Sequence, residues 1–253
     1  MTEAPVDSKG HSRVYVAAIL GVAAVLSAWL FSRAGVEAFL IKHGEKRVTV
    51  TGSATRRIKS DFVVWRATVK SQAPDMAQAY RKLAADVPEV VQFVKLHGVD
   101  EKQIKVAAAT IEEIHPRDKE GHELPETTSA FVTQEVVEVS SGDIDKVEQI
   151  SREATKLIDR GVYITSDAPL YIYTKLSELK VEMLAEASKD ARDRATQIAS
   201  HAGARITGLI VARMGVMQVN PAYSTAVSAE GNNDRSSLEK DALAIVTASF
   251  SVE

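Results

Sequence analysis

RVTVTGSATRRIKSDFVVWRATV, residues 47–69, is the stretch that decides the fold of this chain. Apolar and polar residues alternate before Gly52 and again after Asp61, which is the pattern of two half-buried β-strands. We expect the first strand to cover Arg47–Gly52 and the second to cover Phe62–Ser71. The basic residues between them are then predicted to be solvated charges of a turn: Arg56, Arg57 and Lys59.

Gly52 also raises the possibility of a phosphate-binding loop. Such a loop needs a second Gly followed by Lys, and it leads into a helix whose N-terminus binds the anion. Gly52 stands alone and a strand follows it. The basic run has no interleaved aromatic residues for base stacking. With a net charge of −3 and a pI near 6.1, the chain is not expected to bind nucleic acid.

Downstream, three amphipathic helices alternate with strands. The helices are expected between Pro74 and Gly98, from Asp143 to Gly161, and from Ser177 to His201. Strands are expected at residues 103–115, 129–139, 162–173, 206–218 and 242–252. Because paired strands separate the helices, the predicted fold class is α+β with a mixed or antiparallel sheet.

The third helix carries a stripe of small residues at a spacing of four, which predicts a close approach to its partner: Ala187, Ala191, Ala195 and Ala199. The segment Asn220–Asp241 has few large apolar residues and is expected to be mobile.

An uncharged apolar stretch, Val14–Phe31, lies near the N-terminus between Arg13 and Arg33. Its length suits a helix that crosses a hydrocarbon layer of about 30 Å. We therefore predict four parts: a tail (1–13), a transmembrane anchor (14–31), a linker (32–46) and one domain (47–253). A cleaved signal peptide is the alternative for the apolar stretch. The balance of basic residues on its two sides does not fix the orientation, but a short tail before a large domain favours an extracytoplasmic domain.

The sequence offers no constellation for catalysis. It has no cysteine, which excludes disulfides, thiol catalysis and Cys-ligated zinc. Its six histidines form neither H-x-x-x-H nor H-E-x-x-H, and no G-x-S-x-G elbow is present. His115 and His122 share a loop with several acidic residues. Either a metal site or a solvated polar hairpin would explain this composition. The hairpin is favoured, so no catalytic residue, cofactor or metal ligand is predicted.

Three stretches together resemble a known family. The first is Val48–Ala54 with Ser60, Asp61 and Val63–Ala67, the second is Leu96–Ile104, and the third is Ala191–Ala195 with Ala199, Gly203 and Gly208. In order and spacing they resemble the SIMPL-domain family, which includes periplasmic oxidative-stress defence proteins and 26 kDa periplasmic immunogenic proteins. This chain has Ala54 where the family usually has Gly, and Ser60 where it usually has Pro.

The resemblance implies an extracytoplasmic protein linked to the envelope or to oxidative stress, and some members form large hollow oligomers. We therefore expect a single-pass inner-membrane protein whose domain faces the periplasm, or a secreted periplasmic protein if the segment is cleaved. The expected role is a non-enzymatic homo-oligomeric scaffold, attached to the membrane by its N-terminal helix. Arg56, Arg57 and Lys59 are candidates for contacts with a neighbouring subunit or with anionic lipid. The alternative is a binding module for a small ligand, peptide or metal, using the His115–His122 loop or Asn220–Asp241.

Overall fold

The computed structural model describes Ser27, Trp29 and residues 46–253. The predicted tail, most of the predicted anchor and nearly all of the predicted linker therefore lie outside the described residues. Within the described part of the chain, no helix is both long enough and apolar enough to cross a membrane.

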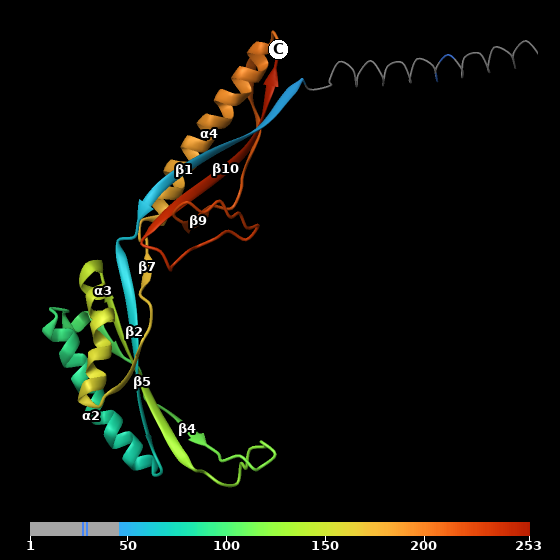
Figure 1. Cartoon of the computed structure of the whole chain (residues 1–253). Helices are drawn as coiled ribbons and strands as arrows, with labels where there is room; N and C mark the ends of the chain where they lie inside the picture. The colour runs from blue at the N-terminus through green and yellow to red at the C-terminus, as the bar shows by residue number, and fades with distance from the viewer. Residues whose placement is uncertain (1–26, 28, 30–45) are drawn as a thin grey trace, which may run out of the picture.

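Residues 46–253 form two antiparallel sheets that lie end to end in an elongated, curved molecule (Figure 1). Three helices cover the outer side of the curve (Figure 1). The elements are β1 (Arg47–Lys59), β2 (Phe62–Ala73), α2 (Met76–Leu96), β3 (Ile104–Val106), β4 (Thr110–Ile114), β5 (Ala130–Ser141), α3 (Ile144–Glu153), β6 (Tyr163–Ser166), β7 (Leu170–Ile172), α4 (Leu176–His201), β8 (Ile206–Met214), β9 (Gln218–Pro221) and β10 (Glu239–Val252).

The first sheet has the strand order β1-β10-β8, and β9 also pairs with β10. β1 and β10 pair without a break from Arg47 opposite Ser251 to Lys59 opposite Glu239. Alternate residues of both strands face α4, and they form a core with the helix that includes Val50, Met183 and Phe250. This is the half-buried alternation that the sequence predicts.

Gly52 lies where α4 touches β1. A Cβ atom at this position would come within 2.3 Å of both the carbonyl oxygen of Ala187 and the amide nitrogen of Ala191. The predicted close approach along the alanine stripe is confirmed, because Ala187, Ala191 and Ala195 are fully buried against the sheet. Glycine is therefore present because the helix backbone leaves no room for a side chain, and no phosphate loop is involved.

The second sheet has the order β3-β5-β2-β6, with β4 also paired to β5 and β7 to β2. α2 and α3 cover one of its faces (Figure 1). Trp65 of β2 is fully buried in this core, and its indole Nε1 donates to Ser166 Oγ at 2.9 Å. The Ser166 hydroxyl in turn donates to the carbonyl of Ser151 at 2.8 Å, so the buried indole has a fixed polar partner.

The chain crosses between the two sheets twice. Ser60 and Asp61 join β1 to β2, and the residues around Thr174 return from β7 to α4. The Asp61 carboxylate connects these crossings by accepting hydrogen bonds from the Thr174 amide and hydroxyl, both at 2.7 Å. Burial opposes ionisation of Asp61, but the Thr174 donors outweigh it and hold the pKa of this carboxyl below its ordinary value.

The predicted α+β class, with three helices and antiparallel sheets, is confirmed. The predicted turn after Gly52 is wrong, because β1 continues to Lys59 and the turn consists of Ser60 and Asp61 alone. Several predicted single strands are divided in two. For example, residues 103–115 contain both β3 and β4, which pair with different parts of β5.

Candidate functional site: the β8 edge and the α4–β8 groove

The three basic residues of β1 point to different faces of the first sheet. Arg56 faces α4 and forms ion pairs with Glu182 and Glu186. Hydrogen bonds to these two carboxylates raise the pKa of the Arg56 guanidinium above its ordinary value. The two acidic residues lie one turn apart on the helix flank nearest β1, so a cation is accommodated within the strand.

Arg57 lies on the opposite face and binds Asp241 of β10, with Nε–Oδ1 at 2.6 Å and Nη2–Oδ2 at 3.0 Å. Its guanidinium also stacks 4.2 Å from the centre of the Tyr223 ring. The hydrogen bond from Arg57, followed by one from the Tyr223 amide, lowers the pKa of the Asp241 carboxyl. The side chain of Lys59 makes no hydrogen bond or ion pair within residues 46–253, although its backbone pairs with Glu239 in the sheet. A role of these residues in assembly or lipid contact stays a prediction.

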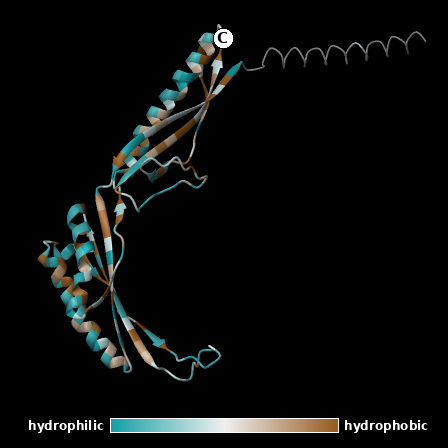
Figure 2. Ribbon diagram, viewed as in Figure 1, coloured by the Kyte–Doolittle hydropathy of each residue, from teal (hydrophilic) through white to brown (hydrophobic). Residues whose placement is uncertain are grey.

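The histidine loop lies at the far end of the second sheet, between β4 and β5, and is almost entirely hydrophilic (Figure 2). The ring nitrogen Nδ1 of His115 lies 3.1 Å from the carbonyl oxygen of Thr127, whereas His122 lies 3.3 Å from Asp118. The two imidazoles thus have separate partners. Within the described residues, no group of three or more His, Asp and Glu side chains is arranged to hold a metal ion.

The segment between β9 and β10, which the sequence suggests is mobile, is held by buried polar side chains. The Gln218 side chain accepts from the amides of Ser228 and Asn232 and donates to two carbonyls. Lys240, only 1% exposed, pairs with Asp234 at 3.0 Å. Burial opposes ionisation of Asp234, but donors from Ser236, Ser237 and Lys240 outweigh it and hold its pKa well below the ordinary value. No local pattern in the sequence signals this network.

β8 is an edge strand with an unusual composition. It pairs with β10 on one side and with no other strand of the described chain. Its nine residues, ITGLIVARM, are nearly all exposed, including Leu209 at 60% and Met214 at 55%. Ile210 and Val211 are exposed as well. Proteins usually protect such an edge with charges, Pro or a covering segment. In the described chain β8 instead presents unpaired backbone groups next to exposed apolar side chains.

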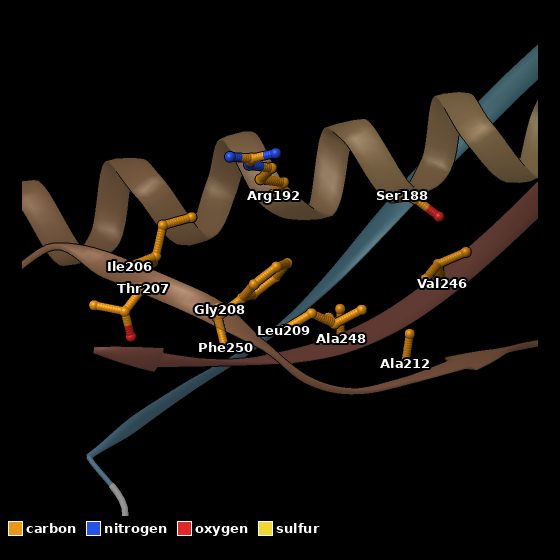
Figure 3. A pocket seen from close by; sticks show the side chains of 10 residues that line it. All are labelled: Ser188, Arg192, Ile206, Thr207, Gly208, Leu209, Ala212, Val246, Ala248 and Phe250. Atoms are coloured by element: carbon orange, nitrogen blue, oxygen red, sulfur yellow. The ribbon is translucent and has the colours of Figure 1, made fainter. Parts of the chain in front are cut away.

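A groove lies between β8 and α4, as Figure 3 shows. α4 packs over β1 and β10 and makes little contact with β8, so it leaves the outer part of this sheet face uncovered. The cavity has a volume of about 330 Å³. Phe250 and Val246 point from β10 toward the helix, and Ser188 points down from α4 (Figure 3). The lining residues are Ser188, Arg192, Ile206, Thr207, Gly208, Leu209, Ala212, Val246, Ala248 and Phe250.

Comparison with known families gives one decisive match. The family described as "SIMPL: Protein of unknown function (DUF541)" matches residues 48–253, which is most of the chain. The chain belongs to the SIMPL family. The matched region coincides with the two sheets and their helices, so the SIMPL domain comprises the whole fold described above. No curated protein matches the chain.

Distant likenesses to this SIMPL domain occur among solved structures. A hydantoinase/carbamoylase family amidase from Burkholderia ambifaria is 17% identical, with 51% of this chain and 30% of the amidase covered and a TM-score of 0.25. The regulatory subunit of aspartate kinase from Thermus thermophilus is 10% identical, with 81% and 89% covered and a TM-score of 0.20. The chain spans less than a third of the amidase, and at these TM-scores neither protein indicates the activity of the SIMPL domain.

Proposed function

We propose that this SIMPL protein is a non-catalytic scaffold that self-assembles outside the cytoplasm and serves the envelope or its defence against oxidative stress. One observation carries the assembly: the free edge of β8, with its exposed Leu209, Ile210 and Val211. An unpaired strand presents a row of backbone donors and acceptors, and apolar side chains beside that row favour pairing with another strand.

The other edge of the same sheet is built differently. β1 also pairs only with β10, but its outward residues are mainly Thr, Ser and charged side chains. Water solvates such an edge well, whereas it solvates the β8 edge poorly. Assembly is therefore expected through β8, by antiparallel pairing with the β8 strand of a second copy. Such a contact is isologous, so one position of the strand faces its own counterpart across the twofold axis.

The absence of native cysteine makes a direct test possible. Single-cysteine variants at residues 209–212 are oxidised under mild conditions, with Thr51→Cys as an exposed control on β1. Isologous pairing brings the position nearest the axis within disulfide range, at Cβ–Cβ separations of about 3.8 Å. We expect disulfide-linked dimers from one or two neighbouring β8 positions and few from Thr51→Cys. In parallel, Ile210→Lys should lower the native mass in light scattering.

Uniform monomers for the unmodified protein, with no crosslinking at any β8 position, would refute assembly through this edge. If the mass is high but Ile210→Lys leaves it unchanged, another surface carries the assembly. In that case Arg56, Arg57 and Lys59 are the next residues to replace.

The membrane anchor and the location belong to the same proposal. The uncharged stretch of residues 14–31 supports a single span in the inner membrane, with the domain in the periplasm. The full chain should then stay with membranes through an alkaline wash, and external protease should cleave the domain in intact spheroplasts. A domain released into the periplasmic fraction would instead indicate cleavage of the segment.

A binding module is the second candidate function. The groove between α4 and β8 favours it more than the histidine loop or the segment between β9 and β10, because those two segments satisfy many of their polar groups internally.

A further inference from the structure

The groove between α4 and β8 has an apolar floor and is open to solvent along its β8 side. Its floor consists of Val246, Ala248 and Phe250 of β10, which are buried. Its outer side is formed by Leu209 and Ala212 of β8, which are exposed. Two helices cover one face of the second sheet, whereas α4 alone lies over the first sheet (Figure 1) and makes little contact with β8.

The two flanks of α4 differ in charge. On the flank toward β1, Glu182 and Glu186 both form ion pairs with Arg56. Asp190, on the same flank, accepts a hydrogen bond from the Ser53 amide and pairs with Arg194. Helical spacing places Val181, Leu184, Ser188 and Arg192 on the flank toward β8. That flank contains no carboxylate. Thus only one charged side chain, Arg192, lines the groove.

Arg192 is also unpaired. Within residues 46–253 its guanidinium makes no hydrogen bond or ion pair, although its neighbour Arg194 binds Asp190 at 2.9 Å. The sequence around the groove explains this difference, because no Asp or Glu occurs between Asp193 and Glu230. Among the residues that line the groove, Arg192 is therefore a cation without a carboxylate beside it in the lining, which suits an anionic group of a ligand.

Size decides between the possible occupants. A volume of about 330 Å³ is at the small end of the range for small-molecule sites, roughly 300–1,000 Å³. A docked helix, at about 10–12 Å across with its side chains, is too large for it. An apolar floor with one cation at the wall suits a ligand with one tail and one negative group.

We propose that the groove binds a single-chain anionic amphiphile, with its apolar tail on Val246, Ala248 and Phe250 and its carboxylate at Arg192. The ligand approaches from the side of β8 that faces α4. This site does not depend on self-assembly, since a strand paired to the β8 edge extends the sheet and leaves the groove between helix and sheet open.

The test uses residues 46–253, because both hydrophobic cores consist only of residues within this range. Dodecanoate is titrated below its micelle concentration in a calorimeter, with dodecanol and dodecyltrimethylammonium as uncharged and cationic probes. We expect saturable binding of dodecanoate near one per chain, weaker binding of dodecanol and the weakest binding of the cationic probe.

Two pairs of variants locate the site. Ala212→Phe fills the groove from an exposed position and should abolish binding, whereas Val211→Phe adds the same ring on the opposite face of β8 and should not. Arg192→Gln should weaken dodecanoate roughly fivefold and leave dodecanol unchanged. Lys189→Gln, which removes an exposed charge of the same helix outside the groove, should change neither.

Three results would overturn the proposal. Equal affinity for dodecanoate and dodecyltrimethylammonium would remove the role of Arg192. Unchanged binding to Ala212→Phe would place the ligand elsewhere. A drop in native mass with Ala212→Phe, without dodecanoate binding to the unmodified chain, would show that a second copy occupies the groove.

Discussion

Replacing Gly52 with Ala tests how α4 packs on β1. The added Cβ would lie 2.3 Å from the Ala187 oxygen and the Ala191 nitrogen, and 2.7 Å from the Ala191 Cα. These are backbone atoms of a helix, so no side-chain rotation can relieve the clash, and the helix must move away from the sheet. Overpacking costs about 1–3 kcal/mol, and a rigid obstacle places this variant at the upper end.

Gly208→Ala provides the matched control in the same sheet. There the nearest atom to an added Cβ is the Ser251 hydroxyl oxygen at 3.6 Å, which is an ordinary contact. Its free energy of unfolding should change by less than about 0.5 kcal/mol. For a chain of this size, a loss of 3 kcal/mol corresponds to a fall in melting temperature of about 6–12 °C.

Urea denaturation and thermal melts of residues 46–253, followed by circular dichroism, measure both variants. Equal stability of Gly52→Ala and Gly208→Ala would refute the close contact between α4 and β1. Adding Ala187→Gly should not rescue Gly52→Ala, because the obstructing atoms belong to the backbone.

Two further predictions concern buried and bridging charges. Lys240→Met leaves the Asp234 carboxylate, whose side chain is 9% exposed, without its cation. Its free energy of unfolding, measured in urea, should fall by about 3–5 kcal/mol. Lys59→Met is the control at an exposed lysine whose side chain has no partner, and its free energy of unfolding should change by no more than about 0.5 kcal/mol. The pKa of Asp61 is lowered in the folded state, so its bond to Thr174 contributes stability above the unfolded pKa of about 3.9 and loses that contribution as the pH falls through the folded pKa. Asp61→Asn should therefore flatten the fall in stability on the acid side; an unchanged acid profile would contradict the role of this carboxylate.

The sequence predicts those features that depend on neighbours along the chain. The alanine stripe of α4 has a spacing that places it on one face of any helix, so the close packing at Ala187 and Ala191 followed directly. The end of β1 was misplaced because three basic residues usually indicate a solvated turn. Arg56 and Arg57 are accommodated in the strand by partners 126–130 and 184 residues away, which no local pattern reveals.

The β8 edge and the groove between α4 and β8 could not be predicted from the sequence for a related reason. The apolar run of β8 has the composition of a buried strand, and only the strand order places it at the edge of its sheet. The burial of Lys240 likewise depends on Asp234 and on the fold of the segment before β10. The absence of Asp and Glu between Asp193 and Glu230 is visible in the sequence. Only the folded chain shows that residues of this stretch line a groove beside Arg192.

The pairing of β1 with β10 has a consequence for synthesis of the protein. Thr49 and Ser249 meet across these strands, 200 residues apart, so β1 leaves the ribosome long before its partner exists. The second sheet, by contrast, is one uninterrupted piece of chain from β2 to β7, and it can fold while α4 is still being made. Completion of the first sheet therefore waits for β10, and a chain truncated before β10 should retain the second sheet but lose the first.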